Sequence, residues 1–304
     1  MIDRYDAYAE ATTSVKVTAA ASLTNIETLK TNVTSLLGSA LSSYSVDSVM
    51  QIVGASAGIL NNASSSTTAA SVRGTLLTYL SSAVSLQDAT SSTVSQQALI
   101  LSKLTSRSSE LSSSGTTSTA YSLVETVAAS GASTGIDQTT ATALGSSISS
   151  LFDTVDANTD ASQLSTSVNN VLRGAWASLA PNEDAITIKA DNFNASNSVA
   201  YAYTLTNSSL SPPRVNSSVT LPSDGLSSLC PEASSTDSIG LSIVGMTDPY
   251  GSSNTSVNSN LLRFSLQATS GCKSSRRRLT SSSSSAISVS VATTSSNTGG
   301  VSSS

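Results

Sequence analysis

The chain has 304 residues, of which 11% are charged, 38% hydrophobic and 4% aromatic, and its formal net charge is -5. It contains no histidine, which excludes catalytic sets and zinc sites that depend on an imidazole. Its 14 basic residues cannot form a phosphate-binding face, so nucleic acid is not an expected partner. Serine and threonine make up about a third of the chain, yet the mean hydropathy is +0.07, higher than disordered chains show.

The sequence also limits the relation of the chain to membranes. No apolar stretch approaches the ~20 residues that cross a bilayer, so we expect no membrane span. Residues 1–17 lack the apolar segment of a secretory signal peptide. This leaves a cytosolic protein or a fragment of a larger chain, and the sequons and cysteines described below favour a fragment of a larger extracellular chain.

Apolar side chains recur at helical spacing from about Ala11 to Ala180, which predicts a bundle of six or seven helices. Four glycines between several of the repeats, Gly38, Gly115, Gly131 and Gly135, are suitable helix breakers or C-caps. The repeats comprise Ala19, Leu23, Ile26, Leu29, Val33 and Leu37; Val46, Val49, Val53 and Leu60; Val72, Leu76 and Leu80; Val94, Ala98, Leu101 and Leu104; Leu123 and Val127; Ala143 to Leu151; and Leu164, Val168, Val171, Leu172 and Trp176.

After Pro181 the apolar period changes to two, which is typical of strands. Turn sequences at 211–213, 222–225 and 248–251 separate the predicted strands. Their alternating residues are Ile186 and Ile188; Val199, Tyr201, Tyr203 and Leu205; Val219 and Leu221; Leu241 and Ile243; Leu262, Phe264 and Leu266; and Ile287, Val289 and Val291. Helices followed by strands predict an α+β fold: a helical bundle over 1–180, a small antiparallel β-sandwich over 181–294 and a disordered serine-rich tail over 295–304.

Sequons and cysteines both indicate an extracellular location. Most sequons lie in the C-terminal part of the chain, beside predicted strand ends and loops, where a glycan can project into solvent. The two cysteines, Cys230 and Cys272, form most simply one disulfide in an oxidising compartment, and two unrelated thiols are the alternative. The candidate N-glycosylation sites are Asn32, Asn62, Asn194, Asn207, Asn216 and Asn254.

The order of these segments resembles the GAIN domain and its REJ-type neighbours, which precede the proteolysis site in polycystin-1-like proteins and adhesion receptors. Residues 122–155 and 165–179 are similar to the last helices of its helical part. Residues 185–193 are similar to the opening of its sheet, and 219–229 to its Leu-Pro step. Residues 239–271 are similar to a strand, an Asn-Pro-Tyr-type turn and a second strand, and 286–291 to the next strand.

The resemblance implies a cell-surface role without catalysis. Family members that cleave themselves use a His-Leu/Thr-type tripeptide, whereas this chain has Arg278-Leu279-Thr280, and arginine does not accept a proton near neutral pH. We therefore expect no self-cleavage at this position. The implied partners are other extracellular or membrane proteins, including a polycystin-type channel subunit, and glycans.

The remaining charged and aromatic clusters predict little chemistry. The run Arg276, Arg277 and Arg278 is interpreted as an exposed loop, with a processing site or contact with an acidic partner as alternatives. Asp153, Asp156 and Asp160 lack the pattern of a calcium loop and are interpreted as a solvated turn. Tyr201 and Tyr203 are expected to pack within the sheet. Glu183 with Asp184, or Asn182, could cap the step from helices to sheet.

The sequence therefore predicts a structural module and no enzyme. With five lysines, no histidine and no clustered carboxylate pair, the chain offers little for a hydrolase site. We expect a non-catalytic module of a large cell-surface glycoprotein that serves adhesion, assembly or force transmission. The alternative is a mucin-like secreted or cell-wall protein whose hydroxyls carry O-glycans.

Overall fold

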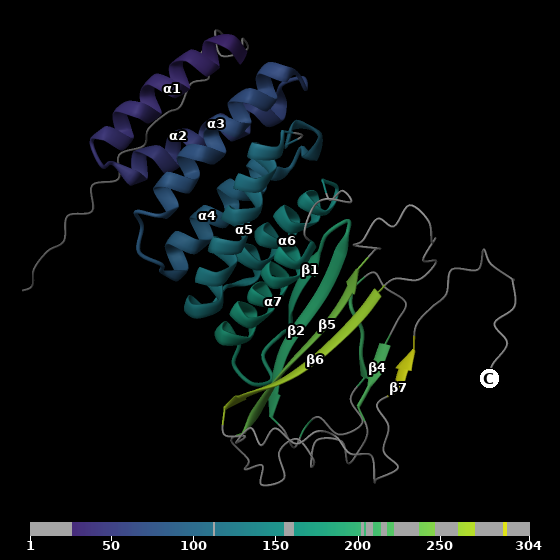
Figure 1. Cartoon of the computed structure of the whole chain (residues 1–304). Coiled ribbons are helices and arrows are strands. Elements are labelled where there is room, and N and C mark those ends of the chain that lie inside the picture. Colours follow the sequence, from purple (N-terminus) through teal and green to yellow (C-terminus); the bar gives the residue numbers. More distant parts are fainter. Residues whose placement is uncertain are drawn as a thin grey trace, which may run out of the picture.

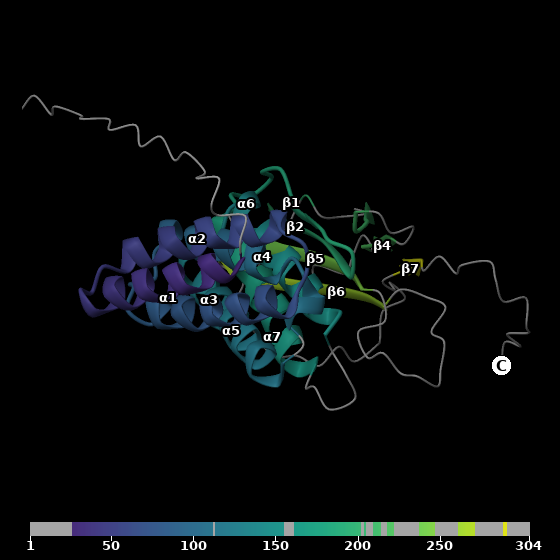
Figure 2. The ribbon, with the colours of Figure 1, turned by 90° about the horizontal axis from the view of Figure 1, so that it is seen from above.

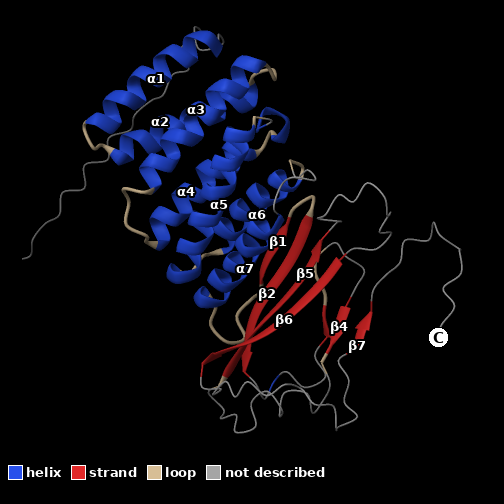
Figure 3. Cartoon of the chain, in the orientation of Figure 1, coloured by secondary structure: helices blue, strands red, loops and turns tan. Residues whose placement is uncertain are grey.

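The computed structural model describes residues 26–111, 113–154, 161–201, 204, 209–213, 218–221, 237–246, 261–270 and 288–290. Within these residues the fold is mixed α+β, with helices first and strands second (Figures 1 and 3). The helices are α1 (Ile26–Ser42), α2 (Val46–Asn62), α3 (Thr67–Val84), α4 (Ser91–Thr105), the short 3-10 helix η2 (Ser108–Leu111), α5 (Ser114–Thr134), α6 (Gln138–Phe152) and α7 (Ala161–Ser178). Each of the seven α-helices carries one of the predicted apolar stripes.

The helices are arranged in two rows. Each helix packs mainly against the next helix along the chain and against the one after that. Figure 2 shows α1, α3, α5 and α7 in one row and α2, α4 and α6 in the other. The stack is therefore built from local contacts, as in repeat proteins.

Local hydrogen bonds explain how so hydroxyl-rich a sequence forms helices. Ser66, Thr90 and Ser113 are N-cap residues whose side chains accept a backbone N–H of the first turn. Within the helices many hydroxyls donate to the carbonyl four residues earlier, as Thr34 does to Lys30 O at 2.9 Å. Such bonds add little stability, so the helices depend on packing of their apolar stripes.

The glycine predictions were mostly wrong. Gly38, Gly115 and Gly131 lie inside helices, and among the four only Gly135 is a C-cap, with a φ of 78°. Gly131 is instead a packing residue, because a Cβ placed on it would lie 2.7 Å from Ile136 Cγ2, in the turn after α5. The packing of Ile136 against α5, and not helix termination at residue 131, accounts for this glycine.

The strands form two antiparallel sheets. A four-stranded sheet has the order β1-β2-β5-β6, with β1 (Ile186–Lys189), β2 (Phe193–Tyr201), β5 (Ser238–Met246) and β6 (Leu261–Ser270). A three-stranded sheet has the order β3-β4-β7, with β3 (Ser209–Leu210), β4 (Ser218–Thr220) and β7 (Ser288–Ser290). β2 begins at Phe193, ahead of the predicted alternation that starts at Val199. Asn194, Ser196 and Ser198 extend the strand, because they alternate with buried neighbours.

The core continues across the change from helix to strand. One apolar cluster, called here the main core, runs from Leu29 in α1 to Met246 in β5. The four-stranded sheet lies against α6 and α7, as Figure 1 shows. A second, small cluster joins Leu221 to Ile239 and Leu241. The strand region contributes Ile186, Ile188, Ala190, Phe193, Ala195, Val244 and Met246 to the main core.

None of the described helices is long and apolar enough to cross a membrane. The outer face of α1 is mostly polar, because Thr31, Asn32, Thr34 and Ser35 are exposed, although Leu36 is also 55% exposed. A polar outer face is what closes the end of a helix stack. The sheet covers the other end, at α6 and α7.

Candidate interaction site

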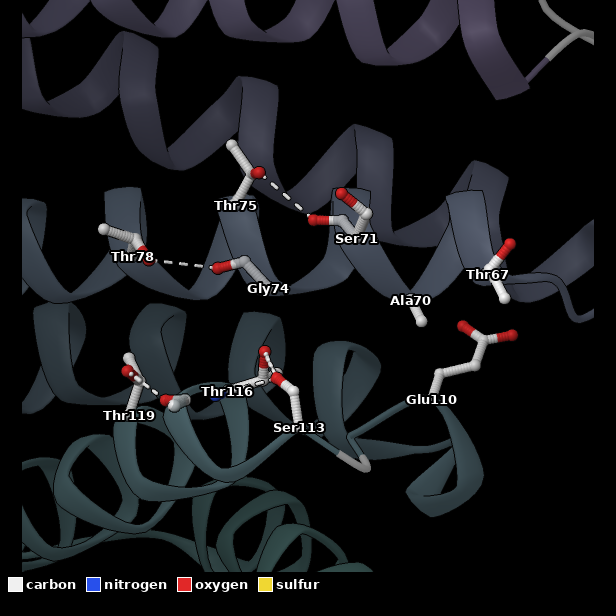
Figure 4. A pocket seen from close by; sticks show the side chains of 11 residues that line it. Thr67, Ala70, Ser71, Gly74, Thr75, Thr78, Glu110, Ser113, Thr116 and Thr119 are labelled. Carbon is white, nitrogen blue, oxygen red and sulfur yellow. Dashed lines mark hydrogen bonds between the residues drawn. The ribbon is translucent and has the colours of Figure 1, made fainter.

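A groove of about 620 Å³ lies between α3 and α5, two neighbours in the same row (Figure 4). Its walls carry small and hydroxyl side chains, and a single carboxylate, that of Glu110, lies at one end. The lining residues are Thr67, Ala70, Ser71, Gly74, Thr75, Thr78, Glu110, Ser113, Gly115, Thr116 and Thr119.

The floor of the groove is set by a close approach of the two helices. A Cβ on Gly74 would lie 2.8 Å from Thr116 Oγ1, so a larger residue here would push α3 and α5 apart. The hydroxyls of Thr75, Thr78 and Thr119 donate to carbonyls of their own helices at 3.1, 3.1 and 2.8 Å. Because each of these hydroxyl protons is already donated to a carbonyl, the hydroxyl oxygens can only accept a hydrogen bond from a ligand.

The carboxylate at the end of the groove belongs to a buried ion pair. Arg73 Nε lies 2.9 Å from Glu110 Oε2, and the two side chains are 0% and 2% exposed. Arg107 Nη1 lies 3.4 Å from Glu110 Oε1. The two guanidinium groups together outweigh the single negative charge, so this end of the groove is not acidic.

Arg73 also holds the ends of two other helices. Its Nη1 donates to Lys103 O at 3.0 Å and Leu104 O at 2.9 Å, in the last turn of α4. Its Nη2 donates to Asn61 Oδ1 at 3.0 Å, at the end of α2. A cation at helix C-termini is electrostatically favourable and satisfies carbonyls that lack a helical partner.

The pKa directions agree with this geometry. Burial would raise the pKa of Glu110, but hydrogen bonds from Ser65, Arg73 and Arg107 and the charge of Arg73 outweigh burial and lower it. Burial lowers the pKa of Arg73, and the bond to Glu110 opposes that effect. The carboxylate is held ionised and fully paired, which makes it a structural group and a poor general base.

The groove is therefore suited to binding a ligand whose surface is polar and uncharged. In the part of the chain that the structure describes, no cluster of acidic or cysteine side chains fits a metal ion. The acceptor oxygens and threonine methyl groups favour a ligand that donates hydrogen bonds and carries no net charge.

One catalytic motif escaped the sequence reasoning. Residues Gly54, Ser56 and Gly58 match the Gly-x-Ser-x-Gly pattern of a nucleophile elbow. The elbow requires a sharp turn between a strand and a helix, whereas these residues lie inside α2 and Ser56 is buried. The pattern arises from a serine- and glycine-rich helix and carries no nucleophile.

The structure places three of the predicted glycosylation sites. Asn32 in α1 and Asn62 at the end of α2 are exposed. Asn194 in β2 is half-buried, and its Oδ1 is buried without a hydrogen-bond partner among the described residues. The other predicted site residues, Asn207, Asn216, Asn254, Cys230, Cys272, Arg276, Arg277 and Arg278, lie outside the described residues, and their roles stay predictions.

The residues at the step from helices to sheet are also placed. Glu183 Oε2 accepts a hydrogen bond from Ala180 N at 2.8 Å. Asn182 has a φ of 65° and donates its backbone N–H to Val199 O at 2.7 Å. Glu183 therefore caps this turn with its side chain, Asn182 takes part through its backbone, and Asp184 is exposed.

Asp153 and Tyr201 are the described members of two other predicted clusters. Asp153 Oδ1 accepts a hydrogen bond from Asn192 Nδ2 at 2.7 Å, which ties the end of α6 to the turn before β2. Tyr201 is half-buried at the end of β2, opposite Ser238. Asp156, Asp160 and Tyr203 lie outside the described residues.

Two contacts between helices and sheet were not foreseen. Trp176 Nε1 donates to Leu241 O at 3.0 Å and joins α7 to β5. The amide of Gln138 pairs with Thr187 in β1, accepting from its N at 2.8 Å and donating to its O. This pairing occupies backbone groups at the edge of the sheet.

The buried ion pair was also not predicted from the sequence. The signal that could have indicated it is the position of Arg73, which directly follows Val72 of a predicted apolar stripe.

No protein-family model matches the chain, and a search of curated proteins likewise found no match.

Proposed function

We propose that this chain is a non-catalytic structural and interaction module in the extracellular part of a large cell-surface glycoprotein of polycystin-1-like type. It serves adhesion, assembly or the transmission of force. The main core carries the proposal, because it runs without a break from α1 to β5. A load on the stack is then borne by packed side chains across the junction between α7 and the sheet, and Trp176 hydrogen-bonds β5 there.

The ionisable groups with shifted pKa values support a structural role. Glu110 and Arg73 pair with each other, and the pKa of Asp137 is lowered by hydrogen bonds from Thr140, because Asp137 is the N-cap of α6. Active sites commonly shift pKa values by 2–5 units to prepare a group for reaction. Here the shifts are accounted for by an ion pair and a helix cap.

The surface supports an interaction role. The groove between α3 and α5 offers neutral acceptors, and the exposed Asn32 and Asn62 offer glycan sites. The partners that fit are other extracellular or membrane proteins, such as a polycystin-type channel subunit, and glycans. In this proposal the two rows of helices correspond to the helical bundle, and β3-β4-β7 corresponds to the second layer of a sandwich, consistent with Leu221 packing on Ile239 and Leu241.

The test is secretion of the full chain from a eukaryotic host behind an added signal peptide. An N-glycosidase should increase its gel mobility, and N32Q and N62Q should each remove one increment. N169Q is a matched control, because Asn169 is a helical asparagine outside any sequon. Material that stays in the cell, unglycosylated and reduced, would argue against the proposal. A chain that leaves no protease-resistant fragment would favour the mucin-like alternative instead.

A further inference from the structure

Two polar side chains lie side by side on the face of the sheet that packs against the helices. Asn197 of β2 and Ser242 of β5 are directly opposite partners in the antiparallel ladder. Two residues away on each strand, Ala195 and Val244 belong to the main core. Because side chains alternate between the faces of a strand, Asn197 and Ser242 point to the same helix-facing side.

Both side chains are removed from solvent and lack partners. Asn197 is 0% exposed and Ser242 is 1% exposed. Asn197 Oδ1, Asn197 Nδ2 and Ser242 Oγ have no hydrogen-bond partner among the described residues. An unpaired buried amide or hydroxyl is costly, and nearly all such groups in folded proteins bond to protein or to ordered water.

The three atoms match the requirements of one internal water molecule. A buried water typically makes two to four hydrogen bonds to otherwise unsatisfied polar groups. Nδ2 donates, Oδ1 accepts, and Oγ can do either, so a water between them both donates and accepts. The amide and the hydroxyl carry no charge, which disfavours a metal ion in this place.

We propose that Asn197 and Ser242 bind an internal water molecule between the four-stranded sheet and the helices. The site lies beside the bond from Trp176 Nε1 to Leu241 O, since Leu241 immediately precedes Ser242. The water is thus part of the junction between α7 and β5.

A high-resolution crystal structure of the full chain tests the site directly. The expected result is a water peak at hydrogen-bond distance, roughly 2.7–3.2 Å, from the Asn197 amide and from Ser242 Oγ. A direct bond from Asn197 Nδ2 to Ser242 Oγ with no density between them would overturn the proposal. So would a rotated Asn197 that bonds another protein group.

The variant S242A tests the site in solution. If a water is bound, removing the hydroxyl leaves the water and Asn197 short of a partner, and the thermal midpoint falls by at least about 2 °C. If the site is dry, the same change removes an unsatisfied hydroxyl, and the midpoint stays or rises, which overturns the proposal. S196A is the matched control on the opposite face of β2, and native-like Trp176 fluorescence verifies folding of each variant.

Discussion

Gly131 of α5 and Gly174 of α7 meet with no side chain between them. A Cβ on Gly174 would lie 2.6 Å from Gly131 O, and a Cβ on Gly131 would lie 2.7 Å from Ile136 Cγ2. Ile136 N also donates to Gly174 O at 3.1 Å. The turn that begins at Gly135 is therefore fixed against α7. The spacing of the two helices depends on Gly174, and the packing of Ile136 in the turn depends on Gly131.

We expect G174A to destabilise the protein. The added methyl group meets backbone at 2.6 Å, and overpacking of this kind costs about 1–3 kcal/mol in unfolding free energy. G58A is the matched control: Gly58 lies in α2 with nothing within 4 Å of its would-be Cβ, so alanine should add about 0.5–1 kcal/mol. Urea unfolding measures both variants, and a G174A protein as stable as wild type would contradict the close approach.

A second prediction concerns the stability of the variant R73M, which breaks the buried ion pair. Methionine removes the buried one of the two arginine partners of Glu110 and the donors to the last turn of α4, so we expect a loss of about 3–5 kcal/mol in unfolding free energy. R173M is the control, because Arg173 is an exposed arginine of α7. Equal urea midpoints for the two variants would show that Arg73 is not buried as described.

A third prediction concerns acid. The pKa values of Glu110 and Asp137 are lowered from their ordinary values of 4.5 and 3.8. The unfolded chain therefore binds more protons in acid, so stability is complete above these ordinary values and falls as the pH drops through the folded pKa values, between about pH 5 and pH 1. No histidine contributes a titration at higher pH.

The variant D137N isolates one part of this effect. Asparagine retains an N-cap oxygen for Thr140 N but does not titrate, so the acid-induced fall in thermal midpoint should be shallower than in wild type. D88N is a control, because Asp88 is an exposed aspartate whose side chain has no such role at a helix start. An identical acid slope in D137N and wild type would exclude Asp137 as a source of the pH dependence.

Apolar spacing predicted where the elements lie, because burial selects one face of each. Val72, Leu76 and Leu80 are buried in α3 as their spacing required. The alternation of Leu241 and Ile243 likewise identified β5, although every residue of that central strand is buried. The expected change from helix to strand near 180 falls between Ser178, the last residue of α7, and Ile186, the first of β1.

Spacing did not predict which elements meet. It marks the apolar face of α5 but not what packs against it, so Gly131 was interpreted as a breaker or C-cap, whereas a Cβ on it would lie 2.7 Å from Ile136 Cγ2. The groove between α3 and α5 could not be predicted either. Its lining hydroxyls do not stand out in a sequence so rich in serine and threonine. The Arg73 network joins residues 37 and 31 positions apart, and local patterns do not encode such pairs.

The last prediction tests whether helices and sheet unfold together. Trp176, the sole tryptophan, is 7% exposed where α7 meets β5, so its fluorescence reports on that junction. If the shared main core makes the fold cooperative, urea transitions followed by Trp176 fluorescence and by helical circular dichroism should coincide. W176F keeps an aromatic ring but loses the donor to Leu241 O, and circular dichroism should show a loss of about 0.5–1.5 kcal/mol. A fluorescence transition well before the helical one would mean that the sheet separates from α7 first and that the helix stack is stable without it.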